Sequence, residues 1–173
     1  NTAFHGPEDF GQSTVTVSDR AERRELGTLD MAVPNAQYAR WIPNGLQGEG
    51  ALVVVSSGVF RLENGVYEPG LGAVEIWEET QDPLIPLRRV KPLTPPEGSR
   101  IGAPGYPAVT ADGSRAYLTS GTAPVVFALD LTSGMWLRGP DNPIRLYETE
   151  DNAAHHLALG PDGILWVTAF NRE

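Results

Sequence analysis

The sequence contains no cysteine among its 173 residues. Disulfide bonds, thiolate nucleophiles and cysteine-based metal sites are therefore excluded. Lysine is almost missing too, since Lys91 is the single one, and 22 acidic residues against 13 basic ones give a formal net charge of −9. Nucleic acids and anionic membranes attract clustered Lys and Arg. The charge balance therefore argues against both as partners.

Long apolar runs are also missing. No stretch approaches the roughly 20 apolar residues that a membrane-spanning helix needs. No charged segment followed by an apolar one stands at the start, so no signal peptide is visible. The sequence opens on Asn1 instead of Met, as a processed or trimmed product would. We expect an extracellular or periplasmic location.

Helical periodicity is nearly absent, and short strand-like runs take its place. Nineteen Gly and fifteen Pro separate runs that are rich in Val, Ile, Thr, Tyr and Trp. Such runs, bounded by turn residues, are typical of β-strands. The pattern predicts an all-β fold with strands over residues 13–18, 23–29, 51–57, 73–78, 86–93, 125–131 and 144–147.

Two hairpins share one pattern. Residues 155–169 read as a strand, a Pro161-Asp162-Gly163 turn and a second strand, and residues 106–120 repeat this around Asp112-Gly113. Residues 52–58, 116–121 and 165–170 share one strand-end pattern, and aligning Ser57, Ser120 and Ala169 gives intervals of 63 and 49 residues. A β-propeller blade has roughly 40–50 residues. The longer first interval is attributed to a loop insertion at residues 60–72. The repeat predicts a β-propeller.

The phase of the repeat predicts how the chain divides. Residues 1–30 form an outer half-blade, 31–97 a blade with the loop insertion, 98–150 a second blade, and 151–173 an inner half-blade. The total is about three four-stranded blades, whereas propeller rings have about 4–8. We therefore expect half of a six-bladed ring, completed by a second copy in a homodimer or by another chain or segment.

The hairpin motifs resemble a known group of enzymes. The Asp-Gly turns followed by Leu165-Trp166-Val167-Thr168 resemble the six-bladed calcium-dependent hydrolase propellers, which are the regucalcin/gluconolactonase, diisopropylfluorophosphatase and paraoxonase-like families. Ser56-Ser57-Gly58, a long loop and residues 69–76 resemble the first blade of paraoxonase-like lactonases. The resemblance covers residues 43–169. It implies a hydrolase of lactones, esters or related small molecules, with a metal in the central channel.

The resemblance also implies site residues. In those families an inner strand begins with a calcium-binding Asn, and the matching position here is His155. A Glu in a Gly-Pro context corresponds to Glu8, which follows Gly6-Pro7. Ca²⁺ is the metal that the resemblance implies, but a His ligand suits Zn²⁺, Mn²⁺ or Fe²⁺ better. The expected metal ligands are Glu8, Asn152 and His155, and His155 is also the candidate catalytic residue.

Each candidate has a structural alternative. On a strand the adjacent His155 and His156 point to opposite faces, so at most one of them can face the channel as a ligand, general base or oxyanion donor. The alternative is a neutral His bonded within the sheet. The run Glu148, Glu150 and Asp151 before Asn152 offers oxygen ligands to a hard cation, or is a solvated acidic loop. Glu8 is likewise a ligand or part of a terminal acidic loop.

The tryptophans divide by position. Trp77 and Trp166 fall inside predicted strands, so we expect them in the core, and Trp136 in a hairpin turn is expected to be the most exposed.

Two further functions remain open. The first is a non-catalytic propeller that binds a partner through its loops, for which residues 60–72 and 92–107 are suited. The second is a different metal-dependent propeller enzyme, a lyase or an oxidoreductase, which the His pair suits better than calcium chemistry does.

Overall fold

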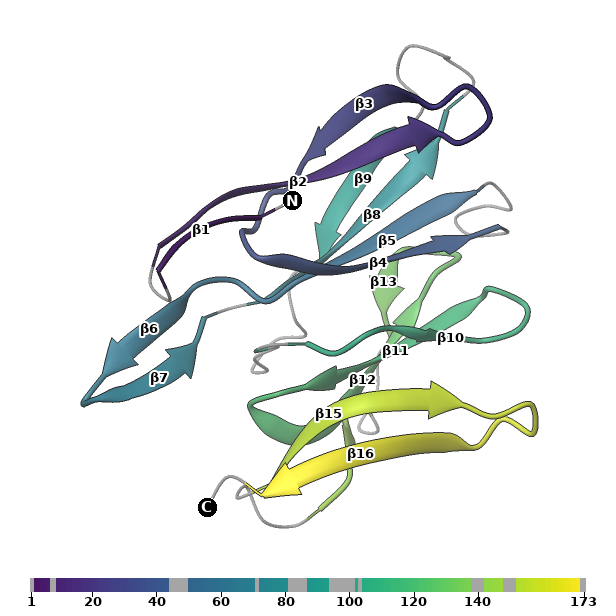
Figure 1. Cartoon of the computed structure of the whole chain (residues 1–173). Coiled ribbons are helices and arrows are strands. Elements are labelled where there is room, and N and C mark those ends of the chain that lie inside the picture. The colour runs from purple at the N-terminus through teal and green to yellow at the C-terminus, as the bar shows by residue number, and fades with distance from the viewer. Residues whose placement is uncertain are drawn as a thin grey trace.

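The computed structural model describes residues 2–6, 9–43, 50–70, 72–80, 87–93, 102, 104–137, 142–147 and 152–171. These residues form strands and turns and contain no helix, so the all-β prediction is confirmed (Figure 1). The strands are β1 (Thr2–Gly6), β2 (Asp9–Asp19), β3 (Arg24–Asp30), β4 (Ala36–Ile42), β5 (Ala51–Ser56), β6 (Phe60–Glu63), β7 (Val66–Pro69), β8 (Ala73–Glu79), β9 (Leu87–Leu93), β10 (Ala108–Val109), β11 (Arg115–Ser120), β12 (Ala123–Asp130), β13 (Met135–Trp136), β14 (Ile144–Arg145), β15 (Asn152–Leu159) and β16 (Leu165–Asn171).

The strands pair into small antiparallel sheets. Their orders are β1-β2-β3, β4-β5-β8-β9 and β10-β11-β12-β13, where β14 also pairs with β12. β15 and β16 form a two-stranded sheet. The hairpin of β6 and β7 stands away from the other sheets (Figure 1). It occupies the insertion predicted at residues 60–72, and it turns at Asn64 and Gly65, which both have positive φ.

Two apolar layers hold the larger sheets face to face. Val53 and Val55 of β5 pack with Leu118 and Leu129 of the β10–β13 sheet. Val54, which points to the opposite face, packs with the β3 end in a second cluster of Leu29, Met31, Val54 and Trp77. Alternation along β5 therefore buries both faces of its sheet. The β2–β3 hairpin, the β4–β9 sheet and the β10–β13 sheet stack in chain order (Figure 1).

The β15–β16 sheet continues this stack. β15 contacts β10, β11 and β12, and Ala153 and Ala154 at its start are fully buried. The opposite face of β16 is open, because Trp166 is 66% exposed. The sheets therefore stack face to face, from the β2–β3 hairpin to the β15–β16 hairpin.

The predicted propeller is not established by this arrangement. The described sheets do not close into a barrel or a ring, so the propeller, its blade boundaries and its ring size stay predictions. In the described part of the chain there is no helix long and apolar enough to cross a membrane.

Candidate functional site

Five side chains meet where the first strands of three sheets come together. They lie on β4, on the segment that leads into β10, and on β15, and we call them the first-strand cluster: Tyr38, Arg40, Tyr106, His155 and His156. Segments more than a hundred residues apart in sequence thereby share one place. A position that joins three sheets is where we look for a binding site.

The two histidines are brought together by a β-bulge. The pairing of β15 with β16 shifts between Ala154 and Leu157, so that His155 and His156 lie opposite Thr168 alone. Their ring centroids are 4.2 Å apart, and the two Nδ1 atoms are 3.0 Å apart. The expectation that adjacent histidines point to opposite faces is therefore wrong, because the extra residue of a bulge breaks the alternation.

Two threonines hold the bulge in place. His156 N–H donates to Thr168 Oγ1 at 3.0 Å, and Thr168 Oγ1 donates to the His156 carbonyl oxygen at 3.2 Å. These two bonds replace the backbone hydrogen bonds that the bulge interrupts. Thr119 Oγ1 of β11 donates to the His155 carbonyl at 2.7 Å and accepts from Gly105 N–H at 3.2 Å. The backbone of the pair is thus fixed from both neighbouring strands.

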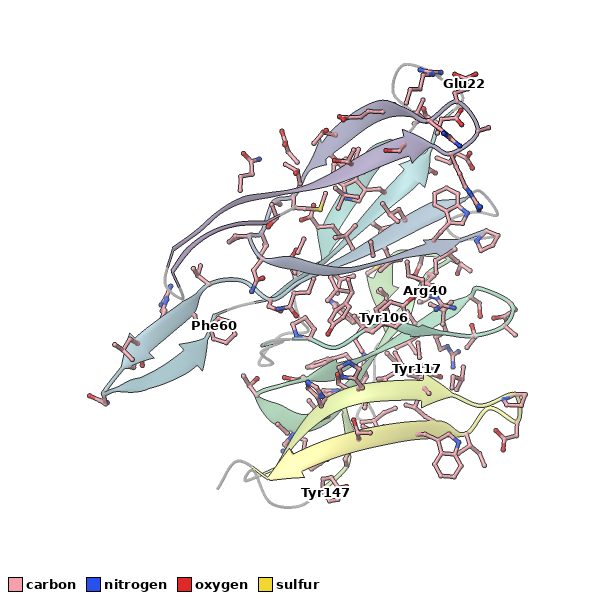
Figure 2. The ribbon with its side chains drawn as sticks, in the orientation of Figure 1. Glu22, Arg40, Phe60, Tyr106, Tyr117 and Tyr147 are labelled. Carbon is pink, nitrogen blue, oxygen red and sulfur yellow. The ribbon has the colours of Figure 1, made fainter. Side chains whose placement is uncertain are left out.

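Aromatic rings connect the histidines to an arginine. The Tyr38 ring meets His156 edge-on at 6.3 Å and Tyr106 at 5.7 Å between centroids. Arg40 Nη1 donates to the Tyr106 hydroxyl at 3.1 Å, and Arg40 Cζ lies 5.6 Å from the centre of that ring. Figure 2 shows Arg40 and Tyr106 reaching toward each other from β4 and the segment before β10. Arg40, Tyr38 and Tyr106 are half-buried.

The arrangement favours some metals over others. Both rings of the His pair are exposed, and their Nδ1 atoms are close enough for one neutral ring to donate to the other. The same spacing fits two ligands of one zinc ion, whose bonds of about 2.0–2.1 Å place neighbouring ligands about 3 Å apart. The cluster offers no carboxylate, so its donors do not fit Ca²⁺, which binds oxygen.

The other predicted metal ligands fall outside the part of the chain whose side chains the structure describes. Glu8, Glu148, Glu150 and Asp151 lie outside the described residues. Asn152 begins β15 and pairs with Asn171, but its side chain is outside the described part. Among the described residues, no group of three or more His, Asp or Glu side chains is placed to hold a metal ion.

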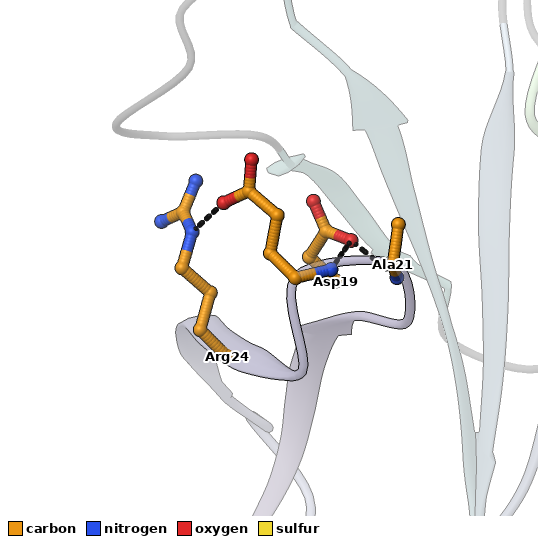
Figure 3. Close-up of polar contacts among 4 residues, drawn as sticks. Asp19, Ala21 and Arg24 are labelled. Atoms are coloured by element: carbon orange, nitrogen blue, oxygen red, sulfur yellow. Dashed lines mark hydrogen bonds and ion pairs between the residues drawn. The ribbon is translucent and has the colours of Figure 1, made fainter.

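The perturbed carboxyl groups belong to hairpin turns and not to the cluster. The Thr110 hydroxyl, and after it the Ser114 N–H and hydroxyl, lower the pKa of Asp112 to about 2. Thr132 likewise lowers the pKa of Asp130, despite partial burial. In the β2–β3 turn, the N–H groups of Glu22 and Ala21 lower the pKa of Asp19 (Figure 3). These carboxylates stabilise turns.

The sequence patterns did not single out three members of the cluster, Tyr38, Arg40 and Tyr106. They also led to wrong predictions for two tryptophans. Tyr38 and Arg40 lie on β4, which was not predicted, although the alternation of Tyr38, Arg40 and Ile42 is a strand signal. Trp77 is buried as expected. Trp136 is half-buried against Phe127, with ring centroids 5.8 Å apart, and Trp166 is exposed, so both of those predictions are wrong.

Neither a protein-family model nor a curated protein matches the chain. The resemblance to hydrolase propellers therefore stays a hypothesis, and the functional argument rests on the geometry of the first-strand cluster.

Proposed function

We propose that the chain contributes to a six-bladed β-propeller, with the first-strand cluster at its central channel. The support is the stacking of antiparallel sheets in chain order, in which the first strands of consecutive sheets bring Tyr38, Tyr106 and His156 together. In a propeller the first strand of each blade lines the channel, so this proximity is what the fold requires.

A second copy of the chain would complete the ring. Among the described strands, β16 pairs only with β15, and β3 pairs only with β2. In a four-stranded blade β15-β16-β2-β3 formed across two copies, the seven-residue β16 lies beside residues 14–19 of β2, which pair with β3. Two copies then supply six blades, and each copy contributes one half of two shared blades.

The function we propose for the channel is metal-dependent hydrolysis of a lactone, an ester or a related small molecule. The observation that carries it is the His155–His156 pair, whose Nδ1 atoms lie 3.0 Å apart on a bulge fixed by Thr119 and Thr168. These two imidazoles would hold Zn²⁺, Mn²⁺ or Fe²⁺, and Asn152 and Glu8 are the predicted additional ligands. When bound, such a metal polarises a carbonyl or activates a water molecule.

Metal binding and activity test this proposal together. Isothermal titration of the full chain with Zn²⁺ is expected to give a saturable site that His155→Ala and His156→Ala each abolish or strongly weaken. Hydrolysis of γ-butyrolactone or 4-nitrophenyl acetate should be lost in the same variants and on treatment with EDTA. Thr132→Ala, in an exposed turn, is the control and should leave binding and hydrolysis unchanged. Absence of zinc binding in the unaltered chain would exclude the metal site.

A non-catalytic binding propeller is the second candidate. The β6–β7 hairpin favours it, because this hairpin stands away from the other sheets and a protruding hairpin can contact a partner (Figure 1). A chain that binds no metal and hydrolyses neither substrate would favour this function over the hydrolase, and over a lyase or oxidoreductase. An extracellular or periplasmic location stays a prediction.

A further inference from the structure

Arg40 is a half-buried cation that has no acidic partner among the described residues. It forms no ion pair within the described part of the chain, where Arg24 and Glu22 make the one ion pair. Its Nη1 donates to the Tyr106 hydroxyl at 3.1 Å, and its guanidinium lies over the Tyr106 ring. Its Nε is buried and has no hydrogen-bond partner in the part of the chain that the structure describes. The positive charge is therefore held by one neutral hydroxyl and one aromatic ring.

The guanidinium of Arg40 is partly withdrawn from water, and its contacts in the described part of the chain supply no counter-charge. A buried charge is costly unless it is paired and hydrogen-bonded. The face of an aromatic ring attracts a cation, but it supplies no counter-charge. Arg40 follows Tyr38 by two residues on β4, and Tyr38 contacts His156 of the histidine pair. The arrangement is explained if an anion completes it.

We propose that Arg40, Tyr106 and Tyr38 form a binding site for the carboxylate of a small organic anion. Arg presents N–H groups in a planar fork that matches a carboxylate. The Tyr106 hydroxyl accepts from Arg40, so its own proton is available to donate to the same anion. The guanidinium and this hydroxyl lie 3.1 Å apart, so one carboxylate can accept from both.

The aromatic rings favour a flat, apolar body next to that carboxylate. Tyr38 stands nearly perpendicular to Tyr106, at 86°, and to His156, at 85°. Such edge-to-face surfaces suit a planar group. Since Tyr38 contacts His156, the anion site adjoins the proposed metal site. This inference rests on the proposed function in naming its substrate class, which is a lactone or ester that carries a carboxylate.

Binding of benzoate tests the site without any metal or reaction. Isothermal titration of the full chain in EDTA is expected to show benzoate binding, with the neutral isostere benzamide binding much more weakly. Arg40→Gln should weaken benzoate binding about 10- to 100-fold, which is the loss of hydrogen bonds to a charged group. Arg145→Gln, which alters an exposed arginine of β14, is the matched control and should bind benzoate like the unaltered chain.

Two outcomes overturn the proposal. One is equal affinity for benzoate and benzamide, and the other is unchanged benzoate affinity in a folded Arg40→Gln variant. If circular dichroism shows that Arg40→Gln is unfolded, Arg40→Lys decides, because it keeps the charge and loses the fork. A folded Lys variant with undiminished affinity contradicts the proposal.

The same experiment separates this inference from the hydrolase. Selective benzoate binding by a chain that binds no zinc and hydrolyses nothing supports the anion site and excludes the proposed function. Hydrolysis of neutral γ-butyrolactone without selective benzoate binding supports the hydrolase and overturns the anion site.

Discussion

At the scale of single residues, Gly105 sets how closely the histidine pair approaches the neighbouring sheet. A Cβ added to Gly105 would lie 2.2 Å from the His155 carbonyl oxygen and 2.4 Å from Thr119 Oγ1. These are the two atoms whose hydrogen bond fixes the bulge, at 2.7 Å. A side chain at position 105 therefore cannot be accommodated unless β15 moves away from β11.

Gly105→Ala is accordingly expected to lower the free energy of unfolding by about 1–3 kcal/mol, as overpacking does. It should also weaken zinc binding if the histidines bind the metal, because the carbonyl of His155 is displaced. Urea denaturation followed by circular dichroism measures the first effect. Gly27→Ala is the control, since nothing lies within 4 Å of its added Cβ, and it should change stability by less than about 0.5 kcal/mol. Equal effects of the two changes would contradict the steric argument.

At the scale of elements, the hairpin turns depend on carboxylates that the turn itself holds ionised. In the β10–β11 turn, Asp112 accepts from the Thr110 hydroxyl at 2.6 Å and from Ser114 N–H at 3.0 Å. Gly113 takes the positive φ of 73° that closes the turn. Because these donors favour the charged form, they lower the pKa of Asp112 from 3.8 to about 2.

This shift determines how acid affects the turn. A carboxyl group whose folded pKa is lowered stabilises the fold above its ordinary pKa and loses this contribution as pH falls through its folded pKa. For Asp112 the window runs from 3.8 down to about 2. Thr110→Val should raise the pKa of Asp112 toward 3.8 and shift acid unfolding to higher pH, as NMR titration of the carboxyl and circular dichroism would record. Thr132→Val should raise the pKa of Asp130 and leave the pKa of Asp112 unchanged. A shifted pKa of Asp112 in that variant would contradict the local cause.

The turns and most strands could be predicted from the sequence, whereas the site could not. Asp112-Gly113 and Asp162-Gly163 are local signals, because the residues that make the turn are adjacent. The bulge at His155 is not local, since Thr168 and Thr119 impose it from other strands. β4 was not predicted although Tyr38, Arg40 and Ile42 alternate, because its two Ala residues weaken the strand signal, and its pairing with β5 fixes it. The cluster exists only after these tertiary contacts form.

At the scale of the whole molecule, the open face and edge of β16 are the features that the stacking leaves unexplained. Trp166 is 66% exposed, and its cross-strand neighbour Ala158 is exposed beside it. The face of the β4–β9 sheet that bears Val54 and Trp77 is covered by the β2–β3 hairpin. In the proposed two-copy ring, β16 pairs with β2 of the second copy, and Trp166 then packs against the adjoining sheet of that copy.

The ring predicts a dimer whose stability depends on Trp166. Sedimentation analysis should give a mass of about twice 18.7 kDa for the unaltered chain, because a monomer would leave a large apolar side chain and an unpaired strand edge in water. Trp166→Glu should shift the equilibrium to monomer, since it places a charge in the buried interface. Leu62→Glu introduces the same charge at a comparably exposed site, 49% exposed on β6, and should remain dimeric. Closure of the ring through β16 is ruled out if the unaltered chain stays monomeric at high concentration. It is also ruled out if Trp166→Glu and Leu62→Glu dissociate alike.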